Sequence, residues 1–147
     1  MRKDDGIGIV VLNRLSLYAD ASQKTHLQNK FDFLDFGTSA VDLANKLAGY
    51  KKALLIDGID AGLKPGELKI FELREIETQN IKENLSSTHQ VDLGQLLALS
   101  KSLGIKTEIF VAGIQVEDVS FGIGLSASLA KNLGLYTDNI FGRLNTL

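Results

Sequence analysis

Four polar side chains of this sequence stand where an open α/β sheet would place catalytic or metal-binding groups. Asp57 ends the apolar run "ALLID", and Asp35 ends the run "FDFLD". Asp5 begins one helical pattern, and His89 lies just before another. Ligands of such sheets bind outside the carboxyl ends of the strands, where helices begin. We therefore expect these side chains to lie at one edge of the sheet.

The types of these side chains allow two kinds of chemistry. Two carboxylates and an imidazole are suitable ligands for a divalent transition-metal ion. Alternatively, one carboxylate could activate a water molecule as a general base. The sequence contains no cysteine, which excludes a cysteine nucleophile, a zinc–thiolate centre and disulfide bonds.

Each candidate also has a structural interpretation, and the residues alone leave the choice open. Asp5, or Asp4 before it, could cap the first helix. Asp57 could form a turn, and His89 could be a helix cap or a surface residue. His26, in the polar stretch "DASQKTHLQNK", is interpreted as solvated surface.

Two glycine-rich stretches are weak indicators of nucleotide binding. The "GIG" at 6–8 lacks the rest of the G-x-G-x-x-G pattern and follows no predicted strand. The "GIGLS" at 122–126 lacks the lysine of a P-loop. Ser126 is predicted to cap the last helix instead.

The composition predicts one globular domain spanning residues 1–147. Apolar residues make up 44% and charged residues 23% of the 147 residues, and the net charge is -2. This charge gives no reason to expect binding to nucleic acid or to an anionic membrane. No apolar run approaches the roughly 20 residues of a membrane span, and the first residues lack a signal-peptide pattern. We expect a cytoplasmic protein.

The hydrophobic patterns alternate between strand-like and helix-like segments. Apolar spacing of three and four predicts helices, and short apolar or alternating runs predict strands. Helices are predicted over 7–18, 40–48, 90–104 and 124–147, and strands over 31–36, 51–57, 67–73 and 106–114. We expect an α/β fold with three layers: a mostly parallel twisted sheet, helices on both faces and one antiparallel or edge strand. The first helix has no strand before it, although βαβ units normally supply one.

Five segments, taken in order, resemble the hydrogenase maturation proteases. These segments are "DDGIG", "LDFGTSAVDL", "LLIDGIDAGLKPGELKIF", "SSTHQVDLGQLLALSKSLG" and "VAGIQVEDVSFGIGLSASL". They are similar to the family's D-D/E-G-x-G, D-x-G-T, strand-Asp with Pro-Gly turn, S-x-H and G-I-Q-P-E segments. The resemblance covers nearly the whole chain, and it implies a phosphorylase/hydrolase-like fold.

The resemblance implies a function and a site. Members of that family are endopeptidases, classed as aspartic-type, that remove the C-terminal peptide of the large-subunit precursor of a [NiFe] hydrogenase after nickel insertion. The implied metal ligands are Asp5, Asp57 and His89. Asp35 is the implied functional neighbour, so that Asp35 or Asp57 would act as the catalytic carboxylate. The implied ion is nickel carried by the substrate, or another divalent metal in the same site.

The sequence departs from the family pattern at three places. Val116 replaces a usual proline, and Phe36 replaces a frequent glycine beside Asp35. The family's first strand and its Gly-Asn turn are absent, so we interpret Met1 as an internal methionine used as the start. We expect an open position in the sheet beside Asp5. We also expect a monomer, and any self-association would occur through the exposed edge of the sheet. The alternatives are a truncated or diverged homologue without catalysis, and a small-molecule-binding α/β domain.

Overall fold

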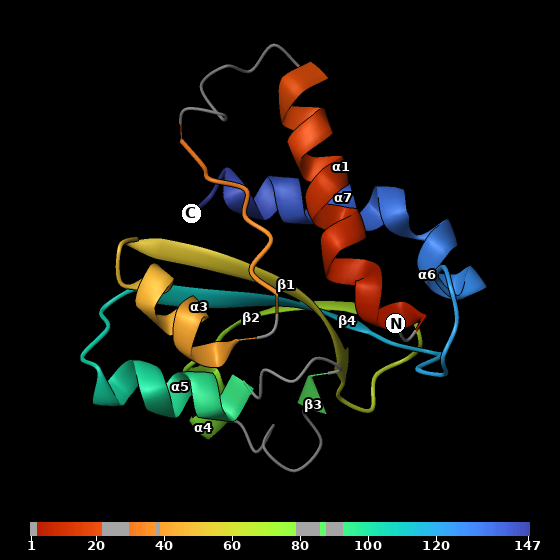
Figure 1. Ribbon diagram of the computed structural model, residues 1–147. Coiled ribbons are helices and arrows are strands. Elements are labelled where there is room, and N and C mark those ends of the chain that lie inside the picture. The colour runs from red at the N-terminus through yellow and green to blue at the C-terminus, as the bar shows by residue number, and fades with distance from the viewer. Residues whose placement is uncertain (1–2, 22–29, 38, 79–85, 88–92) are drawn as a thin grey trace.

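A four-stranded mixed sheet forms the middle layer of the protein (Figure 1). The computed structural model describes residues 3–21, 30–37, 39–78, 86–87 and 93–147. The strands, in the sheet order β2-β4-β1-β3, are Leu68–Glu72, Glu108–Gln115, Lys52–Asp60 and Ser86–Ser87. β1 and β4 are parallel, whereas β2 pairs with β4 and β3 with β1 in the antiparallel sense.

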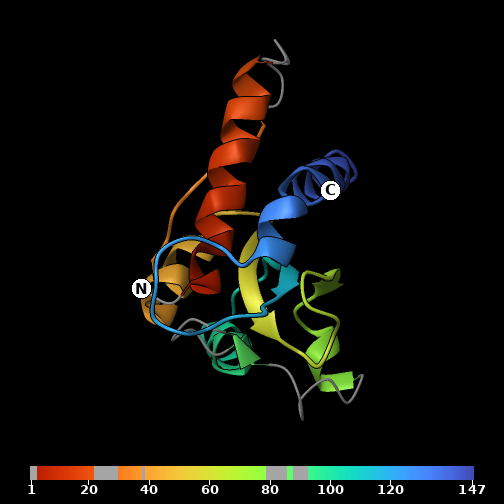
Figure 2. The same ribbon diagram turned by 90° about the vertical axis from the view of Figure 1, so that its right-hand side faces the viewer.

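Three helices cover one face of the sheet. They are α1 (Ile7–Ala21), α6 (Ala127–Lys131) and α7 (Leu133–Leu144) (Figures 1 and 2). Ile7, Val11 and Leu15 of α1 recur every four residues and lie in one core cluster with β4 and α7. The helix predicted over 7–18 is therefore confirmed, and the last predicted helix consists of two.

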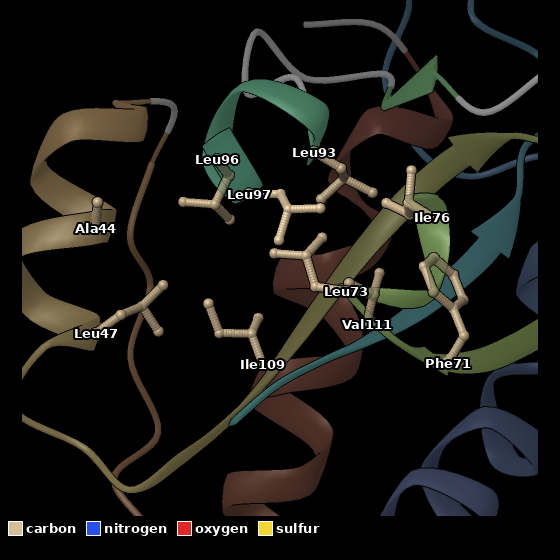
Figure 3. Packing of buried hydrophobic residues seen from close by; sticks show 10 residues of the cluster. All are labelled: Ala44, Leu47, Phe71, Leu73, Ile76, Leu93, Leu96, Leu97, Ile109 and Val111. Carbon is tan, nitrogen blue, oxygen red and sulfur yellow. The ribbon is translucent and has the colours of Figure 1, made fainter. Parts of the chain in front are cut away.

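The other face is covered by α3 (Ala40–Leu47), α4 (Glu75–Thr78) and α5 (Leu93–Ser102). Figure 3 shows the leucine-rich cluster that they form with β2 and β4. Ser39 caps α3, because its Oγ accepts a hydrogen bond from the backbone N–H of Asp42 at 3.3 Å. Gly104 follows α5 with a φ of +65°, as the predicted helix stop requires.

The predicted α/β class, with helices on both faces of the sheet, is confirmed. The strands predicted over 51–57, 67–73 and 106–114 are present as β1, β2 and β4. The strand predicted over 31–36 is wrong, since these residues form no ladder in the described sheet. Of the three pairings described, one is parallel, and it lies at the centre.

The first turn of α1 lies directly against β1. A Cβ atom added to Gly8 would stand 2.4 Å from the carbonyl oxygen of Ile56 and 3.7 Å from the Cα of Asp57. No side chain fits there without a shift of one backbone relative to the other. The glycine therefore allows the close approach that brings the residues before α1 to the carboxyl-terminal half of β1.

We expect Gly8→Ala to lower the free energy of unfolding by about 2 kcal/mol, because overpacking typically costs about 1–3 kcal/mol. Gly134 stands at the same second position of α7 and has no neighbour within 4 Å of an added Cβ. Gly134→Ala should therefore stabilise the protein by about 0.5 kcal/mol through helix propensity alone. Urea denaturation measures both changes. Equal effects of the two substitutions would contradict the close approach.

A hollow of about 790 Å³ opens beside β1, on the side away from β4. β1 and the segment 30–37 form two of its walls, and α1 and α3 contribute Leu12 and Leu47. Among the described strands, only β4 pairs with residues 52–56. Residues 53–57 of β1 are accordingly only half-buried, whereas β4 is buried from Ile109 to Gln115. Within the described ranges, no strand occupies this side of residues 52–56, and the segment 31–36 has no strand partner. The open position in the sheet stays a prediction.

We expect an apolar strand joined ahead of Lys3 through a Gly-Asn turn to fill this hollow and stabilise the protein. Each large apolar side chain that it buries contributes about 1.5–3 kcal/mol, so the melting temperature should rise by more than about 5 °C. An extension of equal length made of Gly, Ser and Asn is the matched control. Calorimetric melts that show the same temperature for both extensions would refute this assignment of the hollow.

Candidate active site

The structure brings Asp5 and Asp57 to the same end of the sheet. Asp5 belongs to a single 3₁₀ turn, η1 (Asp4–Gly6), which lies against β1 directly before α1. Gly8, three residues after Asp5, lies against Ile56 and Asp57. Asp57 does not end its strand as predicted, because β1 continues to Asp60. Its half-buried position instead lines the hollow beside the strand.

The carboxylate of Asp5 has an oxygen atom that lacks a partner. Its Oδ1 is one of two buried side-chain oxygens in the described part of the chain without a hydrogen bond. Such an atom costs about 1–3 kcal/mol when nothing satisfies it, and more when it carries charge. A cation would remove this cost, and a carboxylate oxygen is an ordinary ligand of a divalent ion. This single oxygen is therefore of a type that suits a metal ion, to which it would supply one ligand.

Asp35 lines the same hollow as Asp57. Its side chain is exposed, and its Oδ1 accepts a hydrogen bond of 3.2 Å from the backbone N–H of Gly37. Gly37 has a φ of +60°, which glycine adopts without strain. This local turn fixes the orientation of the Asp35 side chain relative to the backbone. The structure thus places Asp35 and Asp57 around one hollow, beside the first turn of α1.

His89 and His26 lie outside the described residues. The convergence of His89 with Asp5 and Asp57 stays a prediction. Within the ranges that the structure describes, no three His, Cys, Asp or Glu side chains are grouped closely enough to hold a metal ion.

Asp4 has a different role from the helix cap that the sequence predicts. Its buried carboxylate accepts hydrogen bonds from the backbone N–H groups of Glu117, Asp118 and Ser126 at 2.9, 2.8 and 2.7 Å. The Ser126 hydroxyl donates a fourth bond of 2.9 Å. Ser126 does stand at the N-cap position of α6, but its side chain makes no capping hydrogen bond and binds Asp4 instead. The capping predictions for Asp4 and for Ser126 are therefore wrong for the same reason.

Burial raises the pKa of Asp4, but the hydrogen bonds from Ser126, Asp118 and Glu117 together outweigh it, so the pKa of this carboxyl lies below its ordinary value. Asp4 is consequently ionised at neutral pH and binds the loop 117–126 as a charged acceptor. Local sequence patterns give no indication of this contact, because the partners are more than 110 residues away.

The same loop is bound to the start of the chain by further contacts. The backbone N–H groups of Lys3 and Asp4 donate to the carbonyl oxygens of Ser120 and Asp118 at 3.0 and 3.1 Å. The Lys3 ammonium group forms an ion pair of 2.9 Å with Asp118. These bonds fix η1 in position, and they thereby fix Asp5 relative to β1.

Comparison with known proteins assigns the chain to a family. Residues 17–142 match the family described as hydrogenase maturation protease. The chain belongs to the hydrogenase maturation protease family. The family is one of endopeptidases, so the chain is assigned to the hydrolases.

Individual members of the family agree with this assignment. A candidate hydrogenase maturation protease of Methanocaldococcus jannaschii is 29% identical over 146 residues, which are 96% of this chain and 88% of the relative. The [NiFe] hydrogenase maturation protease HybD of Thermococcus kodakarensis has a TM-score of 0.69 at 28% identity, over 98% of this chain and 91% of that one. The maturating endopeptidase HybD of Escherichia coli shares the fold, with a TM-score of 0.74 at 19% identity over 99% and 86% of the two chains. None of the helices in the described ranges has the length and apolar character needed to cross a membrane.

We expect Asp4→Asn to lower the free energy of unfolding by about 3 kcal/mol, because the amide leaves buried N–H donors unsatisfied. Asp118→Asn is the matched control, since it removes the half-exposed ion pair with Lys3 but keeps an amide oxygen that can accept the hydrogen bond from the Ser120 backbone N–H. The control should cost less than about 1 kcal/mol. Urea denaturation of both variants measures the difference. If Asp4→Asn costs no more than the control, the buried carboxylate does not hold the loop.

Proposed function

We propose that this chain is an endopeptidase that removes the C-terminal peptide from the large-subunit precursor of a [NiFe] hydrogenase after nickel insertion. One observation supports this function beyond family membership. The buried Oδ1 of Asp5 has no hydrogen-bond partner, and it belongs to the turn that lies against β1 beside Asp57. A carboxylate left in this state is suited to bind a cation that arrives with the substrate.

We assign the metal-binding role to Asp5, Asp57 and His89. The ion is nickel held by the precursor as cargo, and another divalent metal would occupy the same ligands in its absence. When bound, such an ion supplies Lewis-acid polarisation of the scissile carbonyl group. The three side chains orient the precursor so that its scissile bond lies beside the hollow.

We assign the general base to Asp35, with Asp57 as the alternative. Asp35 is exposed and lines the same hollow as Asp57, so its carboxylate is accessible to a water molecule in that hollow. The carboxylate takes a proton from the attacking water and gives it to the amine that leaves. No side chain becomes covalently attached to the substrate. The precursor is the partner, and the chain acts as a cytoplasmic monomer.

A second candidate function is that of a homologue that keeps the fold without catalysis. The hollow beside β1 favours it, because Asp35 and Asp57 then face a wider and wetter space than a closed sheet would provide. Water in the site weakens the electrostatic interactions on which hydrolysis depends.

The test is incubation of the chain with a nickel-loaded large-subunit precursor, with mass spectrometry to detect the loss of a short C-terminal peptide. We expect cleavage by the unmodified chain and a loss of at least about 100-fold in rate for Asp5→Asn, Asp57→Asn and His89→Ala. Asp138→Asn, an exposed carboxylate of α7, is the matched control and should cleave normally.

Calorimetric titration of the protein with cadmium separates binding from chemistry. His89→Ala and Asp5→Asn should weaken cadmium binding by about 10-fold or more, whereas Asp35→Asn should bind normally and still cleave slowly. Unchanged affinity in His89→Ala would assign this residue to a structural role. Metal binding without any cleavage would favour the non-catalytic homologue.

A further inference from the structure

The loop before α6 exposes large apolar side chains next to the proposed active site. Phe121 and Ile123 are 84% and 102% exposed, the two highest values among the large hydrophobic residues of the described chain, and Val119 is 42% exposed. We call these three residues the apolar loop tip. They fall within five positions of one another, whereas isolated exposed apolar residues elsewhere on the surface need no special explanation.

The apolar loop tip is held by bonds at both ends of its loop. Asp4 accepts hydrogen bonds from Glu117 and Asp118 on one side and from Ser126 on the other. Between them, the backbone N–H of Lys3 donates to Ser120, and a Cβ at Gly122 would lie 2.7 Å from the Lys3 side chain. The fold therefore fixes this loop without burying its apolar side chains. Such exposure is typical of a binding surface.

The position of the loop connects it to the site. The carboxylate that anchors it belongs to Asp4, and the next residue is the proposed ligand Asp5. Ile123 and Leu125 also line a second hollow, of about 680 Å³, together with Lys3 and Glu117. The apolar loop tip therefore belongs to a loop that is bonded to the two residues directly before Asp5.

We propose that Val119, Phe121 and Ile123 form a docking contact for the folded body of the precursor subunit. This inference rests on the proposed function, because the occupant is the same protein whose peptide is cleaved. Carboxylates alone cannot distinguish one metal-bearing protein from another, whereas apolar anchors that fit a complementary surface can. Lys3 is paired with Asp118 beside the tip, and Glu117 adds a further carboxylate, so the tip has no cluster of basic side chains that would attract an anionic bilayer.

The test compares the double variant Phe121→Ser/Ile123→Ser with the control Leu17→Ser/Leu135→Ser. The control residues are 67% and 58% exposed on α1 and α7. With the nickel-loaded precursor, we expect the loop variant to raise KM by about 10-fold or more and to leave kcat within about twofold, because each anchor acts in docking rather than in chemistry. Its melting temperature and cadmium affinity should match those of the control. Equal KM values for the two double variants would overturn the inference.

Precursor binding, measured on a biosensor without cleavage, separates the two proposals. The unmodified chain could bind the precursor without cleaving it, and this binding could be lost only in the loop variant. That result would leave the docking surface standing and remove the proposed function. Cleavage of the precursor with equal KM values for the two double variants would leave the proposed function standing and remove the docking surface. Sedimentation that shows a dimer for the unmodified chain and a monomer for the loop variant would assign the tip to a second copy instead. Flotation of the unmodified chain, but not the loop variant, with phosphatidylserine vesicles would likewise overturn the inference.

Discussion

The carboxylate of Asp4 is the constraint on which the arrangement of the site depends. It is buried and accepts four hydrogen bonds, all from residues 113 to 122 positions later in the chain. A buried charge is tolerated only when such bonds compensate for the lost hydration. Because the compensation comes from both ends of the loop 117–126, the loop and the beginning of the first helix can take up only one relative position. The placement of Asp5 against β1 depends on this relative position of the loop and the helix.

Two adjacent carboxylates thereby acquire opposite roles. Both carboxylate oxygens of Asp4 accept hydrogen bonds, whereas the neighbouring Asp5 retains a buried oxygen without a partner. The difference arises because the side chains of successive residues in a 3₁₀ turn point in directions about 120° apart around the axis. The side chain of Asp4 reaches the late loop, and the close approach of Gly8 to Ile56 sets the turn that carries Asp5 against β1. A structural carboxylate thus positions one that remains available for chemistry.

The sequence predicted those features that depend on local pattern. The apolar runs of β1 and β4 and the four-residue spacing of Ile7, Val11 and Leu15 were sufficient to predict the layers of the fold. The strand predicted at 31–36 is wrong because an alternating hydrophobic pattern describes a single strand. It does not show which neighbouring strand would pair with it. Asp5, Asp35 and Asp57 were selected from strand ends and helix starts. The structure places Asp35 and Asp57 around one hollow and the turn of Asp5 against β1. The role of Asp4 could not be predicted, since no local rule links a residue to a loop more than 110 positions away.

Stability and chemistry are coupled through the hollow beside β1. β1 and β4 are both apolar, yet residues 53–57 of β1 are only half-buried because the space on one side of them is open. Asp35 and Asp57 line that same space, so the water that hydrates the strand also hydrates the two carboxylates. An interaction between charges weakens as the effective dielectric constant around them rises, which makes a dry site more effective than a wet one. Any chain segment that fills the hollow would bury the apolar side chains of β1 and at the same time remove water from the carboxylates. The free energy that stabilises the sheet and the electrostatic strength of the site therefore depend on the occupancy of one position in the fold.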